Sequence, residues 1–386
     1  MNWRFQECGP GDESDFLWVR SWVYDGRPPQ ESDHLADIIG GGRRYLARVD
    51  DQPVGVTNCL TLRARHAHGF VPLAGVATVG IAPTHRNGGY GQRLMAEVIR
   101  AERAQGMVAG ALYAFRDKFY RKQGYASGAA HRMELHVPVD RMPSLAQTLD
   151  ARVATAADIE GLAACHAVFV APYALSVDRH PDRWARMLAS QDSQLFVLGD
   201  PAEAYVYARV KGFYEVLEVN EFAWSSRAGY ESGLAFIRSL AINQSSVKWC
   251  EPEDCPFMSR FHDGQVDVSV DREAMVRVYD VPGALACLKP ALSGAFRLRV
   301  TDPIVPENEG PWRVEFGPGG TTCSPDAGGD LPLVEVDIAT FSGAFFGHPG
   351  WRQMHRMGLV TAADATTLDT LEALMPTGPT YHSELY

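Results

Sequence analysis

The sequence predicts a mixed α/β protein built from three consecutive domains. The chain has 386 residues, and a single domain commonly spans about 100–200 residues. Short apolar strand patterns alternate with amphipathic helix patterns along it. The same order of patterns returns after about 140 residues, and a different order begins at Met275. We therefore expect domains at residues 1–138, 139–274 and 275–386.

The first domain is expected to alternate strands and helices. Its first two strands flank the turn Asp50–Pro53, and one face of its second helix carries Leu94, Met95, Val98 and Ile99. The expected helices are Asp12–Val23, Gln92–Ala104 and Asp117–Lys122, and the expected strands are Arg44–Val49, Val54–Leu60, Gly75–Ala82 and Ala109–Phe115.

The second domain is expected to repeat this order, which indicates a duplication. Its expected elements are the helix Ala154–Val168, the strands Gln194–Asp200, Ala204–Arg209 and Glu218–Trp224, and the helix Glu231–Leu240. The third domain begins with a strand, Met275–Asp280, and a helix that has Pro282 in its first turn. Its other expected elements are strands at Ala295–Val300, Trp312–Phe316 and Leu333–Ile338 and helices at Ala339–Phe346 and Thr366–Leu374.

The composition narrows the functional classes. The formal net charge is −11, and no basic stripe of the kind that nucleic-acid binders carry is visible. An acidic balance favours polycationic substrates, although it also serves solubility alone. No apolar run reaches the roughly 18 residues of a membrane span. The N-terminus has no apolar signal region. We expect a cytoplasmic protein without nucleic-acid or membrane partners.

The seven cysteines are scattered and odd in number. Cys250 and Cys255 form the only close pair, and no second pair has metal-ligand spacing. We expect reduced thiols and no metal.

The strongest local signal is a glycine-rich loop between a strand and a helix, at Arg86–Gly91. Glycines 88, 89 and 91 let the main chain approach a diphosphate, and the following helix directs N–H groups at an anion. Arg86 adds a fixed positive charge. The alternative is an ordinary glycine turn. The pattern Arg-x-x-Gly-x-Gly resembles the pyrophosphate motif of GNAT acetyltransferases, whereas the spacing does not fit a dinucleotide fingerprint.

A second signal is Phe119–Tyr125, which lies a strand and a turn after the loop. Expulsion of a CoA thiolate requires a proton donor, and a phenol with a pKa near about 10 stays protonated at neutral pH. Tyr120 is therefore the candidate general acid. The alternative is an aromatic residue of the core.

Together these residues resemble the Eis (enhanced intracellular survival) family of acetyltransferases. The resemblance rests on Ala74–Val76, Val79, Ala82–Arg86, Tyr120 and Gly124–Tyr125, and on Met275–Leu285 and the tail for the last domain. It implies a catalytic GNAT domain, a degenerate GNAT domain and a sterol-carrier-like domain. It also implies a homo-oligomer, a hexamer in that family, and acetyl-CoA as co-substrate. The implied acceptor is an aminoglycoside, which links the chain to antibiotic resistance.

The resemblance also assigns site residues. The residues implied to hold acetyl-CoA are Val79, Gly80, Ile81, Arg86, Asn87, Gly88, Gly89, Tyr90, Gly91, Gln92, Phe115 and Arg116. The general base would be the terminal carboxylate, here that of Tyr386, because a free α-carboxylate is charged at neutral pH. Without the resemblance, Tyr386 would be a frayed chain end.

The acceptor site is less defined. Trp22 and Asp25 would supply aromatic and acidic contacts to a cation, unless they form a packed helix end. The family often has more arginines where this loop has Asn87 and Gly88. The penultimate residue is Leu385, and the nearest acid is Glu384.

The second domain is expected to be structural, because Glu231 stands where Gly91 does in the first and would repel a diphosphate. Two other functions remain open: acetylation of protein lysines, and a non-catalytic role in lipid binding or scaffolding.

Overall fold

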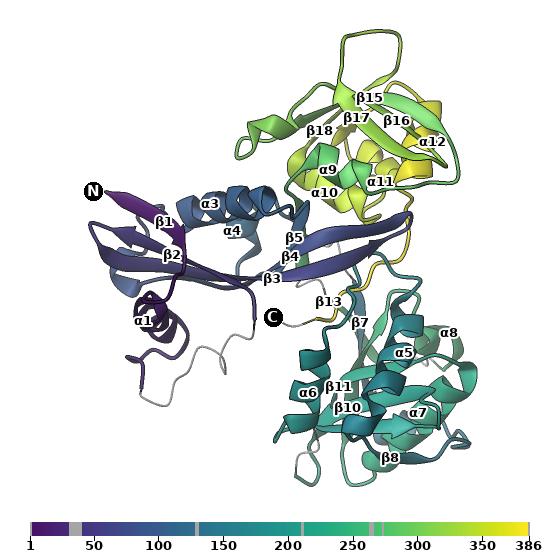
Figure 1. Cartoon of the computed structure of the whole chain (residues 1–386). Coiled ribbons are helices and arrows are strands. Elements are labelled where there is room, and N and C mark those ends of the chain that lie inside the picture. The colour runs from purple at the N-terminus through teal and green to yellow at the C-terminus, as the bar shows by residue number, and fades with distance from the viewer. Residues whose placement is uncertain are drawn as a thin grey trace. The chain divides into compact units, whose positions relative to one another are not determined.

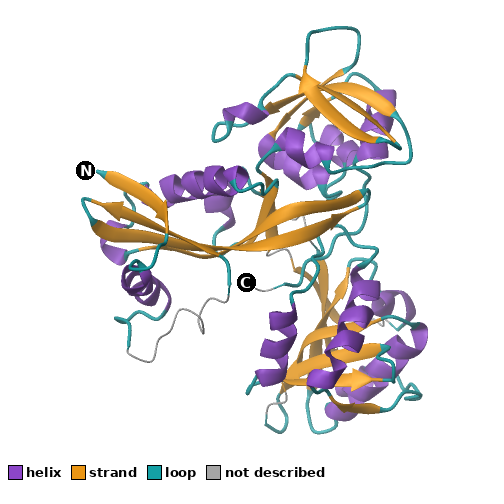
Figure 2. Ribbon diagram, in the orientation of Figure 1, coloured by secondary structure: helices purple, strands orange, loops and turns teal. Residues whose placement is uncertain are grey.

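The computed structural model describes residues 2–30, 41–127, 131–209, 212–261, 266–271 and 274–384. It divides the chain into two compact units. Unit 1 contains residues 1–129, 273–378 and 384–386, and unit 2 contains residues 130–272 and 379–383. The mixed α/β class predicted from the sequence is confirmed (Figures 1 and 2).

The first sheet of unit 1 has seven strands. Their order is β1 (Trp3–Glu7), β2 (Arg43–Val49), β3 (Gln52–His66), β4 (Gly69–Ile81), β5 (Ala109–Tyr113), β14 (Ala274–Val278) and β6 (Ala126–Ser127). Strands β4 and β5 are parallel, whereas β14 runs antiparallel to β5 and fills the position between β5 and β6.

Two helices cover opposite faces of this sheet, as Figure 1 shows. Successive side chains of β2 point to opposite faces of the sheet. Leu46 belongs to the hydrophobic core between the sheet and α1 (Glu13–Tyr24), and Tyr45 belongs to the core between the sheet and α3 (Tyr90–Ala104). The buried residues of α3 recur at helical spacing and include Leu94, Met95, Val98, Ile99 and Glu102. The short helix α4 (Asp117–Arg121) follows β5.

Unit 1 also contains a five-stranded sheet in the order β17 (Gly320–Pro325), β16 (Trp312–Gly317), β15 (Gly294–Thr301), β18 (Leu333–Asp337) and β19 (Val360–Thr361). The helices of this part are α9 (Val281–Ala286), α10 (Ile338–Phe345), α11 (Trp351–Arg356) and α12 (Ala365–Leu374). Helix α10 packs on β14, which connects this part to the first sheet. A hydrogen bond of 2.8 Å from the Val278 N–H to the Ser342 hydroxyl accompanies that packing.

Unit 2 has its own seven-stranded sheet, in the order β13 (Asp267–Asp271), β7 (Arg132–Pro138), β12 (Ser246–Pro252), β11 (Val216–Trp224), β10 (Ala204–Arg209), β9 (Gln194–Leu198) and β8 (Ala151–Val153). Its helices are α5 (Ile159–Val170), α6 (Pro181–Ala189), α7 (Arg227–Leu240) and α8 (Pro256–Arg260). The order helix, hairpin, strand and helix repeats that of unit 1, as expected from the sequence.

The strand pairing does not follow the expected domain boundaries. Strand β7 ends at Pro138, within the expected first domain, but belongs to the second sheet, whereas β14 follows the second sheet in sequence and belongs to the first. Within the described ranges, no helix is long and apolar enough to span a membrane.

Candidate active site

A gap opens in the first sheet where β4 and β5 diverge. The two strands pair only through Leu73–Gly75 and Ala109–Ala111, although β4 continues to Ile81 and β5 to Tyr113. A bulge in β4 accompanies the divergence, because the register with β3 shifts after Ala77 and Thr78 takes a positive φ of 54°. The Thr57 hydroxyl donates to the Ala77 carbonyl at 2.9 Å and fixes the bulge. Backbone groups of β4 beyond the bulge therefore face a gap instead of a neighbouring strand.

The glycine-rich loop connects this part of β4 to α3. Gly89 precedes the helix with a φ of 77°, and Asn87 also has a positive φ, 66°. Within the described residues no side chain caps α3 at Gly89. The first N–H groups of a helix have no partner inside it, so this uncapped end can receive an anion. A Cβ at Gly89 would meet no atom within 4 Å outside its neighbours in the chain, so the space beside Gly89 is open.

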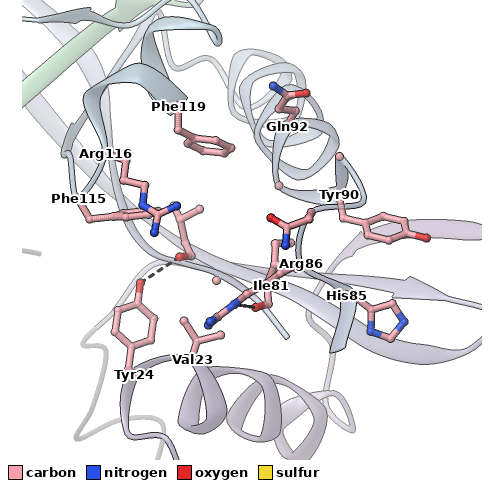
Figure 3. A pocket seen from close by; sticks show the side chains of 15 residues that line it. Val23, Tyr24, Ile81, His85, Arg86, Tyr90, Gln92, Phe115, Arg116 and Phe119 are labelled. Atoms are coloured by element: carbon pink, nitrogen blue, oxygen red, sulfur yellow. Dashed lines mark hydrogen bonds between the residues drawn. The ribbon is translucent and has the colours of Figure 1, made fainter. Parts of the chain in front are cut away.

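The gap and the loop together form a cavity of about 820 Å³. Figure 3 shows side chains of β4, the loop and α3 on one part of its wall and those following β5 on another. The lining residues are Val23, Tyr24, Val79, Gly80, Ile81, His85, Arg86, Asn87, Gly89, Tyr90, Gly91, Gln92, Phe115, Arg116 and Phe119.

The charged side chains of this lining are cationic. The Nε of Arg86 donates to the Ile81 carbonyl at 3.3 Å, and its guanidinium has no carboxylate partner among the described residues (Figure 3). Arg116 lies at the N-terminus of α4, and His85 shares a hydrogen bond of 2.9 Å with the Thr84 hydroxyl. No carboxylate is among the described lining residues. The cavity is therefore suited to an anionic ligand such as a diphosphate.

Exposed aromatic side chains lie at the cavity. Phe115 is 66 % exposed and Tyr24 is 51 % exposed. The Tyr24 hydroxyl donates to the Val79 carbonyl at 3.2 Å, which ties the end of α1 to β4 just beyond the bulge (Figure 3). Desolvation raises the pKa of Tyr24 to about 12, and Arg20 opposes that shift.

Tyr120 lies beside the cavity, in α4, with a side chain only 2 % exposed. Its ring contacts Phe115 and Phe119, which line the cavity, at centroid distances of 5.6 and 4.9 Å. In the part of the chain that the structure describes, no residue forms a hydrogen bond with its hydroxyl. Burial, followed by the neighbouring phenols of Tyr24 and Tyr125, raises the pKa of Tyr120 above its ordinary value. The phenol therefore holds its proton at neutral pH, as a general acid must.

The structure brings together most of the residues predicted to hold acetyl-CoA. All of them line the cavity except Gly88, which lies in the same loop. Neither Trp22 nor Asp25 lines it. Trp22 is half-buried in α1, and the Asp25 carboxylate accepts a hydrogen bond from Arg20. Glu384 is buried near the chain end. Tyr386, the predicted base, lies outside the described residues.

Four lining residues were not predicted: Val23, Tyr24, His85 and Phe119. Each is a sequence neighbour of a predicted residue. Val23 and Tyr24 lie between the predicted Trp22 and Asp25, and His85 and Phe119 directly precede Arg86 and Tyr120. The sequence motifs therefore marked the right segments. Which residue of each segment faces the cavity depends on the exact strand register and helix phase, which the motifs do not give.

Unit 2 contains a counterpart of the loop whose groups are already engaged. Ser226 caps α7 by accepting from the Gly229 N–H at 2.9 Å, and its hydroxyl donates to the Glu203 carboxylate. Glu231 pairs with Arg227 and Arg260. A side-chain carboxylate thus lies at a helix end that in unit 1 has no side-chain cap.

Comparisons with known proteins agree with this geometry. Residues 5–128 match the acetyltransferase (GNAT) domain family, and residues 281–383 match the sterol carrier protein domain family. The comparison with curated proteins gives no match.

Solved structures share the fold of the whole chain. A GCN5-related N-acetyltransferase from Kribbella flavida has 21 % identity and a TM-score of 0.83, covering 100 % of this chain and 98 % of its own. One from Anabaena variabilis has 17 % identity and a TM-score of 0.85, with 100 % of both chains covered. Eis1 from Mycobacterium abscessus has 20 % identity and a TM-score of 0.78, covering 99 % of this chain and 100 % of its own. The chain is therefore an acyltransferase with a GNAT acetyltransferase domain at residues 5–128 and a sterol carrier protein domain at residues 281–383, and it has the fold of these solved structures.

Proposed function

We propose that the GNAT domain binds acetyl-CoA in the cavity and transfers the acetyl group to an amine of a polycationic small molecule, with aminoglycosides as the favoured class. One observation carries the proposal. The cavity joins an uncapped helix N-terminus and the Arg86 guanidinium to the gap between β4 and β5. A diphosphate fits the first part, and an extended amide-containing arm fits beside the part of β4 that does not pair with β5 in the second.

The chemistry requires one proton to leave and one to arrive. The amine nitrogen attacks the thioester carbon, the C–N bond forms, and the C–S bond then breaks to release a thiolate. We assign delivery of a proton to that sulfur to the Tyr120 hydroxyl. Burial raises the pKa of this phenol, and it also destabilises a thiolate nearby. The pKa of the donor and the pKa of the accepting sulfur are therefore both raised.

The amine must lose its proton to a base. We propose the α-carboxylate of Tyr386 for this role, by resemblance to the Eis family. The described cavity lining includes the His85 imidazole and no carboxylate. Glu384, the nearest acid to the chain end, is the first alternative.

Charge distinguishes the donor from the acceptor. The cations of the cavity suit an anionic donor and would repel a polycationic acceptor placed among them. The acceptor is therefore expected to approach from outside this lining, aided by the net charge of −11. Acetylation of protein lysines remains the second candidate, because a lysine side chain presents the same primary amine.

A panel assay tests the proposal. Release of CoA thiol from acetyl-CoA would be measured with aminoglycosides, linear polyamines and lysine-containing peptides at equal amine concentration. We expect the highest kcat/KM with aminoglycosides. A preference for peptides would replace the proposed substrate class. If no amine of the panel stimulated thiol release, the proposed amine acceptor would be contradicted.

A further inference from the structure

An ion pair lies in the interior of unit 1, between the sterol carrier domain and the GNAT sheet. Arg277 of β14 and Asp302, which follows β15, both have side chains that are 0 % exposed. The Nη2 of Arg277 lies 2.7 Å from each oxygen of the Asp302 carboxylate. Two buried charges are costly to desolvate, so a buried ion pair is weak evidence for stability alone. Both side chains of this pair also make other hydrogen bonds.

The sterol carrier domain fixes the acidic partner. Asp302 accepts hydrogen bonds from the N–H groups of Ile304 and Val305, both at 3.1 Å, and from the Asn308 amide at 2.9 Å. Asn308 is also fully buried, and its side-chain oxygen Oδ1 accepts from the Val281 N–H at 2.9 Å. The carboxylate therefore has one orientation, set by residues of the sterol carrier domain.

The basic partner extends in the other direction, to the turn that ends α4. The Nη1 of Arg277 donates to the carbonyl oxygen of Gln123 at 2.7 Å. Gly124 makes this approach possible, because its φ is 77° and a Cβ there would lie 1.8 Å from Nη1. A residue with a side chain at this position would exclude the guanidinium.

The same turn holds Tyr120. The carbonyl oxygen of Tyr120 accepts from the N–H groups of Gln123, at 2.9 Å, and Tyr125, at 3.2 Å. Gln123 therefore connects the two residues, because its carbonyl accepts from Arg277 and its N–H donates to the Tyr120 carbonyl. The cofactor loop and the uncapped end of α3 have no such connection to the ion pair in the described hydrogen bonds.

We propose that Arg277 is a positioning residue for the general acid: it transmits the fixed orientation of Asp302, in the sterol carrier domain, to the turn that aims the Tyr120 hydroxyl. The proposal rests on the proposed role of Tyr120. It gives the sterol carrier domain a part in acyl transfer that needs no lipid.

A double-mutant cycle tests this relation in the full-length protein. Arg277→Lys keeps a positive charge opposite Asp302 but lacks the planar fork that reaches both partners. In the otherwise unchanged chain we expect kcat to fall by about 10- to 100-fold, the range that a misplacement of roughly 1 Å produces, while the KM for acetyl-CoA stays the same. In a Tyr120→Phe background the same substitution should change kcat by less than about twofold, because the hydroxyl that it misplaces is already gone.

A matched control separates positioning from general loosening. Arg43 of β2 forms another ion pair in unit 1, with Glu102 of α3, whose side chain is 0 % exposed. Arg43→Lys removes comparable bonds away from the α4 turn, and we expect kcat to stay near that of the wild type. If Arg277→Lys does not fold, Asn308→Ala replaces it in the cycle, since it weakens the hold on Asp302 and keeps both charges.

The outcomes are distinct. Equal losses in the two backgrounds, or an equal loss from Arg43→Lys, would reduce Arg277 to a structural residue while Tyr120 keeps its role. Unchanged turnover in Tyr120→Phe alone would overturn the assigned acid, and the positioning role would fall with it.

Discussion

Phe119 and Tyr120 are neighbours in sequence, and their rings cross at 82° with centroids 4.9 Å apart. Phe119 lines the cavity, whereas Tyr120 is almost fully buried beside it. Phe119 thus forms an apolar part of the cavity wall, and the neighbouring Tyr120 has its phenol shielded from bulk water. A phenol in that position can serve only a reaction that reaches it through the cavity.

Tyr120→Phe should abolish most turnover and leave the fold intact. The substitution keeps the ring and its contacts and removes only the hydroxyl, and loss of a general acid typically costs about 10²–10⁴-fold. Tyr24→Phe is the informative comparison, because Tyr24 also places a phenol at the cavity. We expect it to lose much less, since its hydroxyl already donates to Val79. The reverse ranking of the two variants, measured by thiol release, would transfer the acid role to Tyr24.

Acetyl-CoA should raise the melting temperature of the wild type and not that of Gly89→Glu. A ligand at 100 times its dissociation constant stabilises the folded state by about 2.7 kcal/mol, and a carboxylate in the loop would repel the diphosphate. Gly106→Glu is a matched control at the other end of α3. Gly106 has a φ of 85°, against 77° for Gly89, and open space around it. An equal ligand-induced shift in both variants would remove the loop from the cofactor site.

A short extension after Tyr386 should reduce turnover without weakening acetyl-CoA binding. The extension converts the α-carboxylate into a neutral amide and moves the new terminus away, so a base located there would be lost. A C-terminal affinity tag is sufficient, with a cleavable version as the control whose activity returns on removal. Full activity in the tagged protein would direct attention to Glu384, and Glu384→Gln would be the next variant.

Acid should weaken the attachment of the sterol carrier domain through His66. The His66 Nε2 donates to the Phe345 carbonyl at 2.7 Å and its Nδ1 accepts from the His68 N–H at 3.2 Å, an arrangement that requires the neutral ring. Burial lowers the pKa of His66 to about 4. In the unfolded chain the pKa of this histidine is about 6.5, so the unfolded state binds a proton that the native state does not. The free energy of unfolding therefore falls as the pH drops below the unfolded-state pKa.

The expected loss of unfolding free energy from this group between pH 7 and pH 5 is about 2 kcal/mol. Urea denaturation at the two pH values would measure it. His66→Gln can keep both hydrogen bonds without a titrating ring, so its stability should change less between the two pH values. An identical pH dependence in the variant would assign the effect to other groups.

Local sequence patterns were sufficient for most elements near the site. The spacing of apolar residues located α3, and the glycines before it located the loop, because both depend on neighbours along the chain. The expected helix Gln92–Ala104 lies within α3, and the expected strand Ala109–Phe115 contains β5.

The sequence could not show which strands pair across long separations. Strand β7 was not recognised, and β14 was assigned to the third domain although it lies in the first sheet. Its pattern Ala274–Val278 is buried throughout and fits either sheet equally well. The partnership between Arg277 and Gln123 was hidden for the same reason, since nothing local marks a contact between residues so far apart.

The position of β14 also sets an order of events during synthesis. All strands of the second sheet come from the continuous stretch 132–271, so that sheet can assemble as soon as this stretch has left the ribosome. The first sheet waits for β14, which emerges about 160 residues after β5, or about 10–30 s later at ordinary translation rates. Until then the growing polypeptide carries an open edge on β5, a template for unwanted pairing. The sheet whose strands are translated first is therefore completed only after the second sheet, and a gene fragment that stops at codon 138 would encode a GNAT domain lacking the strand between β5 and β6.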